Sequence, residues 1–265
     1  MPRQVTAFSN STVKLLRSLR DKKARRTEGL FLAEGLRILT EARDSGMLPE
    51  IIAFSAEGAK HPLAAEIIAA TEAAGGDAIE TTPDILSKMS GKDNPQMLLG
   101  AYRQPDMALE RIDRTKSPLW IVVQALRDPG NIGTILRTGD AAGAGGLILI
   151  DDCADPFSVE SVRASMGALF TQQIAAARWP EFVAWLRSGE GQLVGTSLKA
   201  RQDYLETEYG QPCFLLIGNE QQGLPADYES ECDLLVKIPM AGRADSLNAA
   251  MAAAVMAFAI RASWR

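Results

Sequence analysis

Three polar clusters contain the side chains that could do chemistry, and each cluster follows an apolar run. The first comprises residues 128–131 (DPGN) together with Arg137 in the helix predicted to come next. A positioned guanidinium can bind a phosphate or carboxylate through two parallel hydrogen bonds, although an arginine on a helix can also be a surface ion-pair partner. Asn131 belongs to the same turn. The first cluster therefore predicts an anion site at the carboxyl end of a strand.

The second and third clusters lie in the last fifth of the chain. Residues 217–224 (IGNEQQGL) contain Glu220 between two glycines. Glycines allow the backbone to approach a ligand closely, although an ordinary strand-to-helix turn has the same composition. Residues 238–248 include Ser246 and Asn248 near their end. Ser246 can cap the helix predicted to follow, and the free backbone N–H groups at the start of that helix can hold an anion. A plain helix cap is the alternative.

The composition excludes several classes of enzyme. A single histidine, His61, makes a histidine-based triad or a multi-histidine metal site hard to build, and no metal is expected. The three cysteines are odd in number and lack metal-ligand spacing, which favours reduced thiols and a cytoplasmic protein. Residues 143–146 (GAGG) lack the glycine spacing of a dinucleotide fingerprint, and no Gly-Lys-Ser/Thr phosphate loop is present.

The elements around the first cluster form a strand–helix–strand unit. Strands are predicted at residues 119–123 and 147–150, with a helix at residues 133–142 between them. Open α/β sheets place their sites at the carboxyl ends of strands, which is where Asn131 would emerge. This unit organises the second half of the chain.

The rest of the second half continues this alternation. Further strands are predicted at 172–176, 193–196, 214–217 and 234–238, and helices at 160–169, 179–188 and 247–262. Strands that are apolar throughout favour a parallel sheet buried on both faces. The last helix is rich in small apolar residues, which predicts close packing in a deep core or a homodimer interface.

The first half is predicted to be a smaller α/β domain with a basic face. Residues 1–43 carry ten Lys and Arg against four Asp and Glu, whereas the whole chain has a net charge of −5. A helix is predicted at residues 13–26, and its cations would either be solvated or neutralise RNA phosphates. The candidate RNA contacts on this helix are Lys14, Arg17, Lys22, Lys23, Arg25 and Arg26.

The predicted domain boundaries follow a change in composition. Residues 104–117 are polar and contain Pro105, so we expect a linker between a domain at residues 1–103 and a second at residues 118–265. No apolar run approaches the roughly 18 residues that a membrane span needs, and we expect no membrane partner.

Three segments in order along the second half resemble the motifs of a known family. They are NIGTILRT at 131–138, IGNEQQGL at 217–224 and IPMAGRADSLNAA at 238–250. Together they look like the SpoU (TrmH-type) RNA 2′-O-methyltransferases of the SPOUT superfamily. The basic opening KLLRSLRDKKARRTEGLFLAEG is similar to the substrate-binding domain of ribosomal-protein-L30e type that many members carry.

The resemblance implies a fold, a methyl donor and a set of site residues. The second domain would be a parallel-sheet α/β fold tied as a trefoil knot, which binds S-adenosylmethionine, and members are homodimers. By motif, the catalytic and RNA-orienting residues would be Arg137, Asn131, Glu220, Ser246 and Asn248. The donor would be held by Gly218, Ile238, Leu247, Thr196 and Gly195. Arg163 matches a further family stretch near the RNA entrance.

The function implied is S-adenosylmethionine-dependent 2′-O-methylation of RNA ribose. The L30e-like half favours ribosomal RNA of the 23S type as substrate. The alternatives are a transfer RNA 2′-O-methyltransferase and a non-catalytic RNA-binding protein of the same fold. A nucleotide-cofactor oxidoreductase is a third alternative, and it would require NAD binding that we do not expect.

Overall fold

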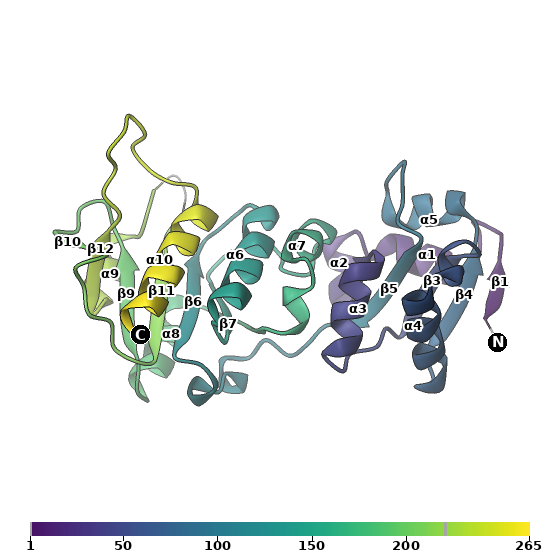
Figure 1. The fold of residues 1–265 in the computed structure, drawn as a ribbon, viewed down its shortest axis with the longest axis horizontal. Helices are drawn as coiled ribbons and strands as arrows, with labels where there is room; N and C mark the ends of the chain where they lie inside the picture. Colours follow the sequence, from purple (N-terminus) through teal and green to yellow (C-terminus); the bar gives the residue numbers. More distant parts are fainter. Residues whose placement is uncertain (1, 220–221) are drawn as a thin grey trace. The chain divides into compact units, whose positions relative to one another are not determined.

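The computed structural model describes residues 2–219 and 222–265, and the chain divides into two compact units. Unit 1 comprises Met1–Pro105 and Asp155–Thr171, and unit 2 comprises Asp106–Ala154 and Gln172–Arg265. Each unit contains its own sheet, and Figure 1 shows the elements of both. Within the described ranges, no helix has both the length and the apolar character needed to cross a membrane.

The sheet of unit 1 has five strands in the order β1, β4, β3, β5, β2. The bounds are β1 (Arg3–Val5), β2 (Leu30–Glu34), β3 (Ile51–Ser55), β4 (Asp77–Thr81) and β5 (Leu98–Arg103). β1, β4 and β3 run parallel, whereas β5 is antiparallel to both of its neighbours. Side chains alternate between the faces along each strand, so both faces of this apolar sheet must be covered.

Helices cover the two faces of this sheet. α1 (Ser11–Ser18) and α5 (Pro83–Ser90) pack together over the face that carries Ala53 and Ile79. The opposite face is covered by α3 (Leu36–Asp44) and α4 (Pro62–Ala73), which also contact each other (Figure 1). A 3₁₀ turn, η1 (Gly58–Lys60), precedes α4.

The helix predicted at residues 13–26 is two helices, so the prediction of a single helix was wrong. α1 ends at Ser18, and α2 (Lys22–Glu28) begins after a turn. The Asp21 side chain caps α2 by accepting hydrogen bonds from the backbone N–H groups of Lys23 (2.8 Å) and Ala24 (3.2 Å). An aspartate that can satisfy free N–H groups favours a new helix start over continuation of the first helix.

Segment Asp155–Thr171 packs in unit 1, although the predicted boundary assigned it to the second domain. It contains α7 (Val159–Ser165) and a 3₁₀ turn, η4 (Ala168–Phe170), where one helix was predicted. The ring centroids of Phe157 and Phe31 are 5.1 Å apart, and those of Phe170 and Tyr102 are 4.9 Å apart. These buried aromatic contacts with β2 and β5 explain why the segment packs in unit 1.

Unit 2 has a seven-stranded sheet in the order β10, β12, β9, β11, β6, β7, β8. The bounds are β6 (Leu119–Gln124), β7 (Gly146–Ile150), β8 (Gln173–Ala177), β9 (Gln192–Thr196), β10 (Gln202–Asp203), β11 (Cys213–Ile217) and β12 (Leu234–Lys237). All adjacent strands are parallel, as predicted from their apolar sequences. The chain runs from β6 outward through β7 and β8, and β11 lies on the other side of β6. The strand order therefore switches direction between β6 and β11.

Helices cover both faces of the second sheet. α6 (Pro129–Ala142) and α10 (Ala249–Ser263) lie side by side on one face (Figure 1). On the other face, Trp179 and Phe182 of α8 (Trp179–Arg187) pack in the core with Trp120 and Phe214. The short helix α9 (Ala226–Glu231) adds Tyr228 to this cluster and was not predicted.

The predicted linker is partly a packed segment of unit 2. Residues 104–117 contain two 3₁₀ turns, η2 (Leu109–Arg111) and η3 (Arg114–Lys116), and both Leu109 and Ile112 are buried in the core. The Arg114 guanidinium lies 3.8 Å from the centroid of the Trp185 ring and donates to the carbonyl oxygen of Leu186 at 2.8 Å. A cation at the end of α8 adds hydrogen bonds to the last carbonyl groups of the helix, where the helix dipole is negative.

Candidate active site and RNA-binding face

The direction switch between β6 and β11 contains the first pair of predicted site residues. Asn131 lies in the first turn of α6, directly after β6, and Asn248 precedes α10. The Asn248 Nδ2 donates a hydrogen bond of 3.2 Å to the Asn131 Oδ1. Two predicted site residues that are 117 positions apart are therefore in contact, at the place where open α/β sheets bind their ligands.

Asn248, and not Ser246, caps the last helix. The Asn248 Oδ1 accepts from the backbone N–H groups of Ala250 (2.9 Å) and Met251 (3.4 Å). The prediction of Ser246 as the cap was therefore wrong by two residues. The Asn248 carboxamide forms hydrogen bonds through both Oδ1 and Nδ2, so the cap also orients the Nδ2 that contacts Asn131.

Arg137 is exposed on the surface of α6. Among the described residues, it forms no ion pair and no hydrogen bond with Asn131 or Asn248. It lies six positions after Asn131 in the helix, a rise of about 9 Å. The Arg137 guanidinium is therefore available to bind an external anion. Glu220 lies outside the described residues.

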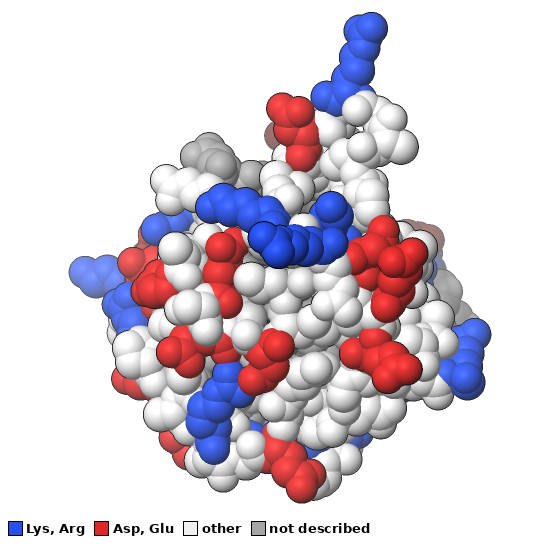
Figure 2. Space-filling model, turned by 90° about the vertical axis from the view of Figure 1, so that its left-hand side faces the viewer, with Lys and Arg blue, Asp and Glu red and all other residues white. Residues whose placement is uncertain are grey.

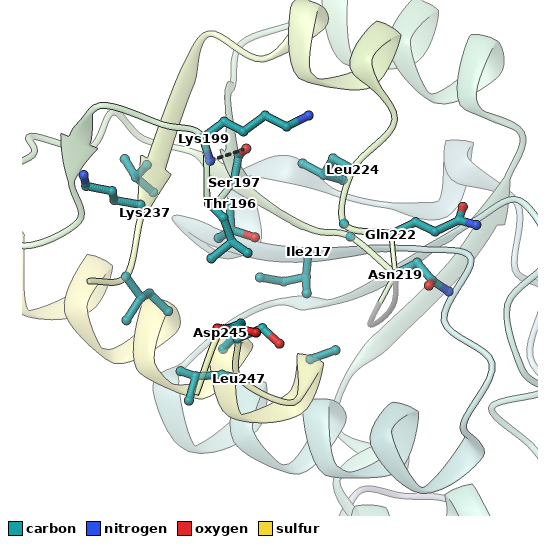
Figure 3. A pocket seen from close by; sticks show the side chains of 18 of the residues that line it. Thr196, Ser197, Lys199, Ile217, Asn219, Gln222, Leu224, Lys237, Asp245 and Leu247 are labelled. Atoms are coloured by element: carbon teal, nitrogen blue, oxygen red, sulfur yellow. Dashed lines mark hydrogen bonds between the residues drawn. The ribbon is translucent and has the colours of Figure 1, made fainter. Parts of the chain in front are cut away.

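Next to this pair is a cavity of about 370 Å³. Its walls come from the segments that follow β9 and β11 and from the segment that joins β12 to α10 (Figure 3). Four of the five predicted donor-binding residues line it: Thr196, Gly218, Ile238 and Leu247. Ser246 lines it too. The second and third polar clusters thus converge on one cavity.

Gly218 is required where β11 enters this cavity. A Cβ atom at position 218 would lie 2.5 Å from the carbonyl carbon of Gly223. The backbone N–H of Gly223 donates to the Asn219 carbonyl oxygen at 2.9 Å, which holds Gly223 beside the end of β11. Gly195, the fifth predicted residue, does not line the cavity. Its absent Cβ makes room for Cys232 Sγ, to which a Cβ would come within 2.7 Å.

Asn219 is a functional candidate that the sequence interpretation missed. Its Nδ2 donates a hydrogen bond of 2.9 Å to the carbonyl oxygen of Ala125, at the end of β6. Ala125 has a φ of +48°, a conformation that an alanine rarely adopts. Asn219 thus ties the ends of β11 and β6 together. Its position two residues after a buried strand was the available signal.

The cysteines are poor candidates for nucleophiles. Burial raises the pKa of the Cys213 and Cys232 thiols to about 12 and also raises the pKa of Cys153. The thiolate is the reactive form, so all three thiols stay protonated near neutral pH. In the described ranges, no group of three or more His, Cys, Asp or Glu side chains could hold a metal ion.

Arg25 is a structural residue, and its prediction as an RNA contact was wrong. Its side chain is only 3% exposed and forms an ion pair of 2.6 Å with Asp155. Its Nη1 also donates to the carbonyl oxygens of Leu19 and Arg20, both at 2.9 Å. The guanidinium therefore stabilises the turn between α1 and α2 and has no free donor face for a phosphate.

The other predicted RNA contacts are exposed. They are Lys14, Arg17, Lys22, Lys23, Arg26 and Arg163. No ion pair joins any of these six to an acidic residue within the described part of the chain. Lys14, Arg17 and Arg20 also line a hollow of about 490 Å³ beside the turn that Arg25 stabilises. Unpaired cations grouped on α1 and α2 are the surface that a polyanion would contact.

Both halves of the chain match known protein families. The profile of the SpoU rRNA Methylase family matches residues 118–258, and that of the MRM3-like substrate binding domain matches residues 10–100. A 23S rRNA (uridine(2479)-2′-O)-methyltransferase from Streptomyces viridochromogenes is 33% identical over 91% of this chain and 85% of its own length. A 23S rRNA (guanosine(2553)-2′-O)-methyltransferase from Bacillus subtilis is 29% identical over 98% and 99%.

A solved structure agrees with these matches. The AdoMet-bound rRNA methyltransferase from Sinorhizobium meliloti has a TM-score of 0.91 and is 39% identical to this chain. The match covers 98% of this chain and 97% of that structure. The α/β fold predicted from the motifs is confirmed, as is the smaller amino-terminal domain. This chain belongs to the SpoU rRNA Methylase family.

Proposed function

We propose that this chain transfers a methyl group from S-adenosylmethionine to a ribose 2′-hydroxyl of ribosomal RNA of the 23S type. The Asn131–Asn248 contact beside the cavity of Gly218, Ile238 and Leu247 carries the proposal. It supports a reaction site and a donor site that adjoin at the same sheet edge. The names of relatives that match nearly the whole chain support the substrate class.

The lining of the cavity suits S-adenosylmethionine. Ile217, Val236 and Leu247 provide apolar walls, and the absent side chain of Gly218 lets the backbone of Gly223 pack against the wall of the cavity. Its volume of about 370 Å³ lies in the usual range for small-molecule sites. When bound, the donor supplies an electrophilic methyl group with a neutral thioether as its leaving group. The residues would bind and orient the two reactants, and the proton of the 2′-hydroxyl would pass to an RNA phosphate oxygen or to water.

The residues around the cavity would position the ribose for an in-line displacement. Arginine stays protonated at ordinary pH and is therefore a poor general base. We assign Arg137 to the RNA phosphate next to the reacting ribose, where its charge also stabilises the forming alkoxide. Asn131 and Asn248, fixed against each other, would orient the substrate. Ser246 and Glu220 complete the proposed set by motif.

Unit 1 would hold the RNA through the exposed cations of α1 and α2 together with Arg163. Each phosphate that a protein neutralises releases counterions, so the affinity depends on the salt concentration. Replacing Lys22, Lys23 and Arg26 with Gln should weaken RNA binding and lower the slope of log affinity against log salt by about one unit per lost phosphate contact. Donor affinity, measured by calorimetry, should not change. An unchanged slope would contradict this assignment.

A homodimer is proposed for the whole enzyme. The outer face of α10 carries Met251 (49% exposed) and Phe258 (52% exposed), with Val255 between them at helical spacing. Large apolar side chains in one stripe favour burial against another surface, and the resemblance of the chain favours a second copy. The trefoil knot and a cytoplasmic location also rest on the resemblance and the composition, and they stay predictions.

The proposal is tested by labelled methyl transfer from S-adenosylmethionine to RNA from cells that lack the gene, with the products separated by size. Label in large ribosomal RNA, lost in Arg137→Ala, is the expected result. Label in the transfer RNA fraction would support RNA methylation but would show that transfer RNA, and not ribosomal RNA, is the substrate. If the chain fails to bind the donor and no RNA is labelled, the non-catalytic RNA-binding alternative is favoured.

A further inference from the structure

One end of the cavity contains a carboxylate whose second oxygen has no partner among the described residues. Glu229 and Ser197 both line this end, and both are half-buried. The Ser197 hydroxyl donates a hydrogen bond of 2.6 Å to the Glu229 Oε1. No ion pair joins Glu229 to a cation in the described ranges.

Ser197 is itself fixed, and this sets the direction of its hydrogen bond. The Ser197 backbone N–H donates to the Val236 carbonyl oxygen at 3.0 Å, which holds the end of β9 against β12. The Lys199 backbone N–H donates to the Ser197 Oγ at 3.2 Å. The hydroxyl accepts one bond and directs its proton at Glu229. Figure 3 shows Thr196 and Ser197 across the cavity from Asp245 and Leu247.

The helix that carries Glu229 is anchored on its other side. Tyr228 of α9 stacks on Trp179 with 3.9 Å between the ring centroids, and its hydroxyl donates to the Asp151 Oδ2 at 2.7 Å. Consecutive helical residues point about 100° apart, so anchoring Tyr228 in the core directs Glu229 to a different side of α9. The Glu229 carboxylate is thus positioned by α9, which Tyr228 anchors, and by Ser197 at the end of β9.

The surface on the side of β10 and β12 carries charges of both signs (Figure 2). Figure 2, viewed from the side of β10 and β12, shows a band of Lys and Arg side chains above several acidic groups, with further Lys and Arg scattered toward the edges. Mixed signs do not favour a polyanion on this surface. A carboxylate inside the cavity instead suits a ligand with N–H or O–H donors.

A ligand that fills the cavity would exclude water from Glu229. A carboxylate oxygen without water must find a donor on the ligand or lose its solvation. We propose that Glu229, oriented by Ser197, accepts a hydrogen bond from the methyl donor and so contributes to its recognition. This inference rests on the proposed function. The donor groups available are the ribose hydroxyls, the adenine 6-amino group and the amino-acid ammonium group of S-adenosylmethionine.

The test measures binding by calorimetry in the absence of RNA. The ligands are S-adenosylhomocysteine and 5′-methylthioadenosine, which lacks the amino acid, and the variants are Glu229→Gln and Glu231→Gln. Glu231 lies in the same helix but does not line the cavity. A charge-assisted hydrogen bond predicts that Glu229→Gln binds S-adenosylhomocysteine about ten- to a hundredfold more weakly, with Glu231→Gln unchanged.

The two ligands distinguish the nucleoside from the amino-acid part of the donor. An equal loss for 5′-methylthioadenosine would assign the contact to the nucleoside, through its ribose hydroxyls or adenine amino group, and a loss confined to S-adenosylhomocysteine would assign it to the amino-acid ammonium group. Binding of both ligands to Glu229→Gln within twofold of the unsubstituted chain would overturn the inference. Failure of the unsubstituted chain to bind either ligand would instead contradict the proposed function. Circular dichroism checks that each variant is folded.

Discussion

Asn248 has two roles that can be separated by substitution. Its Oδ1 caps α10, and its Nδ2 contacts Asn131. The sequence alone indicated both asparagines as site residues, because each belongs to a polar cluster after an apolar strand. It did not indicate which residue caps the helix, because Ser246 and Asn248 are both good caps and only the course of the chain decides between them.

We predict that Asn248→Ala lowers the free energy of unfolding by about 0.5–2 kcal/mol through loss of the cap. Asn248→Asp keeps an oxygen acceptor for the helix N–H groups but cannot donate to Asn131. It should retain the stability and still lose most of the methyl transfer. Urea unfolding and labelled transfer measure the two effects. Full activity in Asn248→Asp would show that the contact with Asn131 is not needed.

At the scale of elements, the turn between α1 and α2 decides which cations face solvent. The predicted helix at residues 13–26 placed Arg25 among the exposed cations, and the charge pattern could not distinguish them. The break at Asp21 changes the direction of the chain, and Arg25 then pairs with Asp155, which lies 130 residues away. A contact across that separation depends on tertiary packing, and helical periodicity does not report it.

Arg25 and its neighbour Arg26 form a matched pair for testing this difference. Arg25→Met should destabilise unit 1 by about 3–5 kcal/mol, because it leaves the Asp155 carboxylate and two carbonyl groups without their partner. Arg26→Met should leave the stability nearly unchanged and weaken RNA binding. Thermal unfolding and RNA titration of both variants check this. Equal stabilities for the two would contradict the structural role of Arg25.

At the scale of the whole molecule, the apolar pattern predicted the layered α/β architecture well. Strands such as residues 119–123 and 214–217 are buried on both faces, so their sequences are continuously apolar and easy to recognise. The short elements α9 and β10 were missed because six and two residues give too little periodicity. The allocation of residues 155–171 to unit 1 depends on ring contacts among Phe31, Phe157 and Phe170, which no local pattern predicts.

The apolar stripe on α10 gives a prediction about assembly. The chain of 28.6 kDa should sediment at twice this mass, and the double variant Met251→Glu/Phe258→Glu should sediment at the mass of a single chain. Charged side chains would have to be buried in the interface, at a cost too large for a stable dimer. Leu205→Glu, at an exposed leucine outside α10, is the control and should remain dimeric. A double variant that stays dimeric would show that the dimer interface does not include this face of α10.

The site formed by Asn131, Arg137 and Asn248 is proposed to methylate the 2′-hydroxyl of ribose. The most direct measurement is mass spectrometry of nucleosides from ribosomal RNA treated with the enzyme and S-adenosylmethionine, then digested and dephosphorylated. We predict that one 2′-O-methylated nucleoside increases, and that Arg137→Ala abolishes the increase while still binding the donor. A methyl group on a base instead of the ribose would show that this site is not a ribose 2′-O-methyltransferase site.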